Sequence, residues 1–147
     1  MSRPGSSLPP PPVARWLVHL GLLPFVSGAL LVWLVHPEVQ PHVTLALAGH
    51  AAVVLSFLGG VQWGLAVRQP VPSPVPCTWG VVLAGVAWVA VVMPPYAGLV
   101  VLGAMQLLAC LVDRRLYPGL GARGWLVLRF RLAAVASLSC FLAAAGV

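Results

Sequence analysis

Few residues in this chain could bind a ligand or move a proton, and the most suggestive set shares one predicted helix. Gly103, Gln106, Cys110 and Asp113 are spaced three, four and three apart, so they fall on one face. Polar groups in hydrocarbon usually face the interior of a bundle. These residues, with Gln62, could line a polar cavity. Alternatively, Gln106 makes an interhelical hydrogen bond and Asp113 pairs with an arginine, which is the interpretation we favour.

The histidines could suggest a metal or haem site. His19 and His50 fall in two different predicted helices, and counting residues places them roughly 15 Å apart in depth. They cannot ligate one haem iron, so each is expected to be a hydrogen-bonded interhelical residue, with a position at the membrane interface as the alternative for His19. His36, Glu38 and His42 share a short loop, and imidazole and carboxylate can bind zinc or copper. Their spacing matches no established motif, so we expect an exposed polar turn and no metal.

No catalytic constellation is visible. A nucleophile with its base and acid is missing, as is a glycine loop that could cradle phosphate. The three cysteines, Cys77, Cys110 and Cys140, are odd in number and form no CxxC pair, so they are read as small apolar residues. We therefore expect a protein that is not an enzyme and needs no cofactor.

Composition places the chain in a membrane. Of its 147 residues, 61% are hydrophobic and 7% are charged, whereas about a quarter of the residues in a soluble domain are charged. The net charge of +6 is the balance of eight arginines against Glu38 and Asp113, and there is no lysine. These arginines flank apolar runs, which indicates anchoring in a lipid bilayer and not binding of nucleic acid.

Five apolar segments are long enough to cross a bilayer, which takes about 20 residues. The predicted fold is all-α: a polytopic transmembrane bundle of five helices after a disordered, proline-rich tail at 1–15. The prolines at 70, 72, 74 and 76 predict a non-helical connection between the second and third helices. The predicted helices are 16–35, 43–67, 77–93, 96–112 and 126–147.

Arginine placement predicts the orientation. With five spans, every arginine falls on one side of the membrane, and merging or dropping a span would scatter them. The positive-inside rule then places the N-terminus in the cytoplasm and the C-terminus outside. The arginines are Arg3, Arg15, Arg68, Arg114, Arg115, Arg123, Arg129 and Arg131. Five of them are predicted to anchor at the membrane interface: Arg68, Arg114, Arg115, Arg129 and Arg131.

Small residues predict where helices pack, because close approach of backbones drives association in lipid. Gly49, Ser56, Gly60 and Trp63 form one predicted stripe on the second helix, and Gly60 with Gly64 makes a GxxxG pair. We expect this stripe to be a packing face.

The run LSFLGGVQWGLAV, residues 55–67, resembles the signature of a family catalogued as domain of unknown function 3429. The resemblance rests on Ser56, Phe57, Gly59 and Gly60 followed by Trp63 and Gly64, and the run 21–25 resembles the family's first helix. It implies a small five-span membrane protein without an established molecular function. The family often has histidine before Trp-Gly, whereas this chain has Gln62, which disfavours a metal ligand there.

These observations leave two functional hypotheses. The first is a non-enzymatic accessory, assembly or binding protein of a bacterial inner membrane, contacting lipid, other membrane proteins or itself. The second is a small transporter or a lipid- or quinone-binding protein. The second hypothesis draws on the polar face around Gln106 and on a helix break expected at Pro24.

Overall fold

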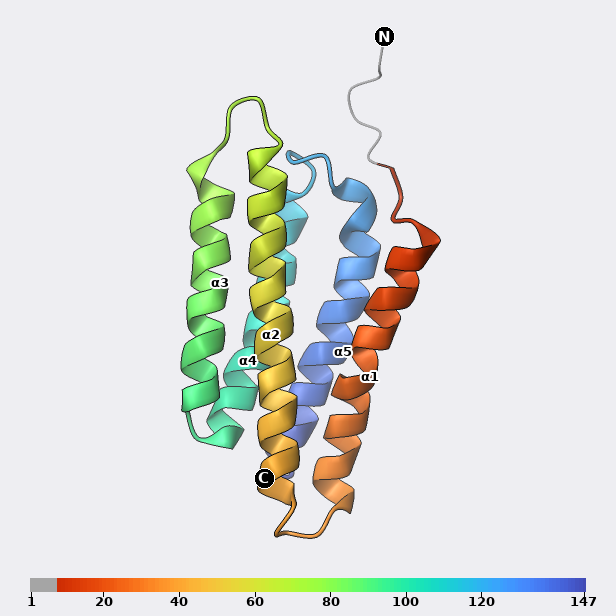
Figure 1. Cartoon of the computed structure of the whole chain (residues 1–147), viewed down its shortest axis with the longest axis vertical. Helices are drawn as coiled ribbons and strands as arrows, with labels where there is room; N and C mark the ends of the chain where they lie inside the picture. Colours follow the sequence, from red (N-terminus) through yellow and green to blue (C-terminus); the bar gives the residue numbers. More distant parts are fainter. Residues whose placement is uncertain (1–7) are drawn as a thin grey trace.

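The structure, a computed structural model, describes residues 8–147, and in that range the chain folds into five long helices without a strand (Figure 1). A short 3-10 turn, η1, precedes the last helix. The predictions for residues 1–7, including Arg3, lie outside the described part. The elements are α1 (Pro12–Leu34), α2 (Gln40–Val67), α3 (Pro74–Val92), α4 (Pro95–Leu116), η1 (Arg123–Trp125) and α5 (Leu126–Ala145).

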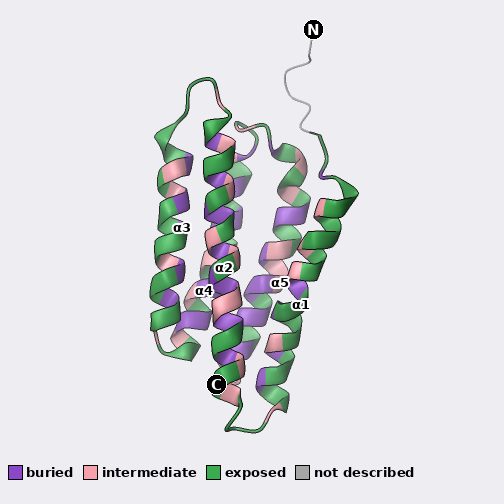
Figure 2. Ribbon diagram, viewed as in Figure 1, coloured by how far each residue is buried: buried purple, intermediate pink, exposed green. Residues whose placement is uncertain are grey.

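All five long helices are long and apolar enough to cross a membrane. They run up and down, so α1 begins at one end of the bundle and α5 finishes at the other (Figure 1). Large apolar side chains such as Trp16, Trp88 and Phe130 are exposed, while many of the buried residues are small. Figure 2 shows that each long helix has both exposed and buried positions along its length. An apolar exterior on spanning helices is the arrangement that lipid requires, so the chain is a multi-pass membrane protein.

Three helices begin at prolines, earlier than predicted. Pro12, Pro74 and Pro95 each occupy the first helical position, where a missing N–H costs nothing and the fixed φ favours a helix. The prediction of a disordered segment up to residue 15 is therefore wrong for residues 12–15. The prediction of a non-helical connection is wrong from Pro74 onward, where Ser73 caps the new helix by accepting from the Val75 N–H at 3.3 Å.

Helix α4 also runs four residues beyond its predicted end at 112, to Leu116. Arg114 and Arg115 lie in its last turn, where positive charge interacts favourably with the helix dipole. This extension places Asp113 within a regular helix.

Pro24 does not break α1, contrary to the expected helix break. A proline removes one backbone bond and crowds the preceding turn. In that turn the Gly21 carbonyl accepts from Nε2 of His50 on α2 at 3.0 Å, and the His50 ring packs edge-on against Phe25. His50 is thus an interhelical hydrogen-bond donor, as predicted, and it supplies a partner beside the proline.

A close backbone approach joins α2 to α3. A Cβ on Gly59 would lie 2.5 Å from the Gly80 carbonyl oxygen, and a Cβ on Gly80 would lie 2.5 Å from that of Gly59. The predicted stripe is wrong by one position: Gly59 faces inward, whereas Gly60 and Gly64 face outward with nothing within 4 Å of an added Cβ. Consecutive helical residues point about 100° apart, so only one of two adjacent glycines can serve this contact.

Candidate functional site: a buried polar cluster

The residues best suited to bind a ligand or hold a charge meet inside the bundle, near one of its ends. All the described arginines lie at this end, which is called here the arginine end. Asp113 on α4 is the centre of the cluster. Its Oδ2 accepts from Arg129 Nε of α5 at 2.6 Å, and its Oδ1 accepts from Gln62 Nε2 of α2. Asp113 and Arg129 are 1% and 4% exposed. One carboxylate therefore joins three helices that are distant in sequence.

The burial of Arg129 overturns its predicted role as an interface anchor. On α5 it shares a face with Ala133, Ala136, Cys140 and Ala143, all buried. That face packs against α4, so the guanidinium group lies against Asp113 and not in the headgroup region. An unpaired charge would be costly there, whereas a hydrogen-bonded partner offsets much of the penalty. The other predicted anchors, Arg68, Arg114, Arg115 and Arg131, are exposed at the arginine end.

The predicted polar face of α4 is buried as a unit. Gly103, Gln106, Cys110 and Asp113 all point into the bundle. Of the two predicted roles, the salt bridge of Asp113 is present. The hydrogen bond of Gln106 is not, because neither amide atom of this fully buried side chain has a partner among the described residues.

Gly103 serves packing and not a cavity. An added Cβ would lie 2.8 Å from the Phe141 ring and 3.2 Å from Cys140 Cβ. The Gly103 carbonyl accepts from Ser137 Oγ of α5 at 2.8 Å, so α4 and α5 are also in close contact more than two helical turns from the ion pair. Two surface grooves are present elsewhere, and Gln106 lines neither. The predicted polar cavity of these residues is thus a packed interface around a few polar groups.

Tyr117 completes the cluster at the end of α4 and was not singled out from the sequence. Its side chain is 4% exposed, although it follows two arginines in what reads as a surface loop. Burial raises the pKa of its phenol, the nearby Asp113 charge raises it further, and Arg129 opposes both effects. The phenol therefore stays protonated beside the ion pair.

The signature residues divide into two sets. Gly59 and Gln62 face the interior, and Ser56 is half-buried. Trp63 donates from Nε1 to the Cys77 carbonyl at 2.9 Å, which links α2 to the start of α3. Phe57, Gly60 and Gly64 face outward, so the predicted packing role of these three is not fulfilled within the chain.

Chemically, the cluster can hold charge and position helices. Both oxygens of Asp113 accept from donors, and the phenol of Tyr117 is protonated. Cys110, a free and buried cysteine, lies one turn before Asp113 on the same face of α4. Among residues 8–147, the buried side-chain groups without a hydrogen-bond partner are Gln62 Oε1, both Nη atoms of Arg129, the Gln106 amide and, on α3, Trp79 Nε1. Among residues 8–147, no three His, Cys, Asp or Glu side chains come close enough to hold a metal, His36, Glu38 and His42 included.

Comparison with known proteins agrees with the family resemblance noted from the sequence. A Transmembrane protein 69 from Xenopus tropicalis is 43% identical over 63 residues, which are 43% of this chain and 24% of that protein. The chain therefore aligns with only about a quarter of this relative. No solved structure matches the chain significantly. Residues 10–145 match the family described as "Protein of unknown function (DUF3429)", nearly the full length, and the chain therefore belongs to this family.

Proposed function

We propose that this protein is a non-enzymatic accessory or assembly factor that binds other membrane proteins, or a second copy of itself, within the bilayer. The observation that carries the proposal is the outward GxxxG pair of α2. Gly60 and Gly64 lie one turn apart on the lipid-facing surface, and a Cβ added to either would meet nothing within 4 Å. Such pairs let a second helix approach closely.

The surface around this pair is open to an approaching helix. Phe57 precedes Gly60 by three residues and is 69% exposed, and Trp63 beside Gly64 is 47% exposed. Large side chains therefore flank two positions that have none. Because the inward face of α2 is already filled by Gly59, Gln62 and their neighbours, the outward glycines are not needed to hold this chain together.

Substitution of Gly60, Gly64 and a matched glycine tests the proposal. Gly85 on α3 is equally open and serves as control. The full chain is cross-linked in native membranes and purified in mild detergent. We expect Gly60→Leu and Gly64→Leu to abolish the cross-linked species, because a leucine side chain prevents the close approach of a second helix. Gly85→Leu should preserve it. A wild-type chain that forms no cross-link, or equal effects of all three substitutions, would contradict the proposal.

We further propose a bacterial inner membrane as the location, with the arginine end in the cytoplasm. The support is that every described arginine lies at one end while Glu38 lies at the other. The relative named above is from a eukaryote. Fractionation of the source organism's membranes tests the location directly.

One observation favours a second candidate, a small transporter or a lipid- or quinone-binding protein. The buried Gln106 amide in the middle of α4 and the Arg129 Nη atoms near the arginine end are unpartnered among residues 8–147, and such groups often mark the path of a polar solute or ligand. Organic extracts of the purified protein should then contain an isoprenoid quinone that Gln106→Leu removes. Equal quinone content in both proteins would dismiss this candidate for quinones.

A further inference from the structure

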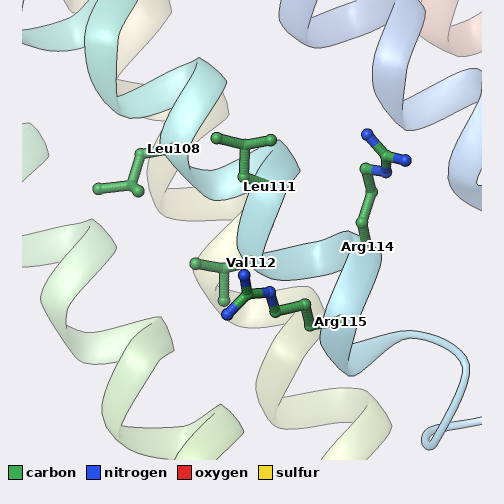
Figure 3. A pocket seen from close by; sticks show the side chains of 5 residues that line it. All are labelled: Leu108, Leu111, Val112, Arg114 and Arg115. Carbon is green, nitrogen blue, oxygen red and sulfur yellow. The ribbon is translucent and has the colours of Figure 1, made fainter.

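We propose that the groove on the outer face of α4 at the arginine end binds one anionic phospholipid. The groove has a volume of about 560 Å³. Apolar side chains form its floor, and two guanidinium groups stand at its edge (Figure 3). The lining residues are Leu108, Leu111, Val112, Arg114 and Arg115. This inference does not rest on the proposed function, which concerns α2.

The order of residues along α4 matches the order of groups in a phospholipid. Leu108 and Leu111 lie toward the middle of the helix and are 44% and 57% exposed, while Arg114 and Arg115 occupy its last turn. An acyl chain can therefore lie over the leucines while the phosphate meets the arginines. Figure 3 shows the Arg115 side chain folded back toward Val112, with Arg114 leaving the helix in another direction.

Charge complementarity selects an anionic occupant. Arg114 and Arg115 are exposed, and neither forms an ion pair with any residue from 8 to 147. The one carboxylate at this end, Asp113, is buried and already engaged by Arg129 and Gln62. The protein thus supplies no counter-charge to these two arginines. Guanidinium groups bind phosphate through strong, often bidentate hydrogen bonds, and a lipid headgroup provides phosphate at this depth.

Lipid binding to defined variants tests the inference. The full chain in mild detergent is titrated with dioleoyl phosphatidylglycerol or dioleoyl phosphatidylcholine, and bound lipid is counted by native mass spectrometry. Two arginines near a surface contribute enough attraction for about 30-fold tighter binding of the anionic lipid. We expect Arg114→Gln/Arg115→Gln to abolish that preference. The matched control, Arg68→Gln/Arg131→Gln, removes the same charge from exposed sites outside the groove and should retain it.

Two further measurements separate a lipid site from simpler alternatives. Leu108→Ser/Leu111→Ser keeps both arginines and should weaken phosphatidylglycerol binding severalfold, since the acyl chain loses its contact surface. Millimolar inorganic phosphate should not displace the lipid. The inference is overturned if the control double variant loses as much preference as the groove variant, if the serine variant binds normally, or if phosphate displaces the lipid.

Discussion

Arg129 Nε lies 2.6 Å from Asp113 Oδ2, and this ion pair joins α5 to α4 where both side chains are almost completely buried. Gln62 brings α2 to the same carboxylate. The pair is thus the point where the second, fourth and fifth helices are held by directional bonds in an otherwise apolar bundle. In low dielectric such bonds fix helix register, since any shift leaves a charge without its partner.

Removing one partner of this ion pair should be far more harmful than removing both. Asp113→Leu or Arg129→Met alone leaves the other member of the ion pair as an uncompensated buried charge. Each single substitution should therefore lower the unfolding free energy by about 3–5 kcal/mol. The double variant should recover most of that loss, because an apolar pair can replace a buried ion pair. Unfolding in mixed micelles on titration with sodium dodecyl sulfate measures all three.

The control for these three variants is Arg131→Met, which replaces an exposed arginine two residues further along the same helix. Its effect should remain within about 0.5 kcal/mol. Additive losses in the double variant would show that the two side chains act independently, against the geometry.

Substitutions at Gln62 should show whether this side chain stabilises the bundle by donating a hydrogen bond or only by filling space. Gln62→Leu removes the bond to Asp113 Oδ1 and should lower the unfolding free energy by about 1 kcal/mol, the range measured for polar bonds between membrane helices. Gln62→His retains a ring N–H donor and should be tolerated better. Unfolding of both in the same micelles decides the matter, and equal losses would refute a donor role.

The number and approximate limits of the helices could be predicted from apolar run length, because a bilayer imposes a fixed span. Burial of Arg129 could not be predicted from its position near a helix end, which suits an interface anchor equally well. Its pattern did contain a signal: Arg129, Ala133, Ala136, Cys140 and Ala143 repeat at helical spacing as a small-residue face. Assigning Arg129 to that face would have predicted that its side chain is buried.

Adjacent glycines show where sequence alone fails. Gly59 and Gly60 have the same local propensity, and only the position of α3 determines which one meets another backbone. Likewise, nothing near Tyr117 in the chain signals that its side chain is buried. Tertiary packing, and not local preference, determines which of these residues are buried. The helix starts at Pro12 and Pro74, in contrast, could be predicted from the sequence, because proline is well suited to the first helical position.

Adding a single methyl group to Gly59 should therefore destabilise the bundle, while adding it to Gly60 should not. Gly59→Ala forces a Cβ to 2.5 Å from the Gly80 carbonyl oxygen, and the shift of α2 from α3 should cost about 1–3 kcal/mol. Gly60→Ala meets open space and should be neutral or stabilising by up to about 1 kcal/mol through helix propensity. Thermal unfolding of the detergent-solubilised monomer compares them, and a more harmful Gly60→Ala would contradict the packing described.

Stability should fall in alkaline solution because of Tyr117. Its phenol has a raised pKa in the folded protein, whereas the unfolded chain releases this proton near pH 10. The unfolded state thus binds fewer protons above pH 10, so the unfolding free energy decreases as pH rises further. Unfolding midpoints measured from pH 8 to 11.5 should show this decline, and Tyr117→Phe should reduce its slope. An identical slope in the variant would place the effect elsewhere.

The two ends of the chain should lie in different compartments. Five spanning helices give α1 and α5 opposite ends of the bundle, and the arginine end, where α1 begins, should be cytoplasmic. Alkaline phosphatase fused after Val147 should be active and green fluorescent protein fused there dark, while a fluorescent fusion at the N-terminus should be bright. As control, Arg114→Glu/Arg115→Glu weakens the arginine asymmetry and should yield mixed orientation. Both termini reporting from one compartment would be incompatible with five crossings.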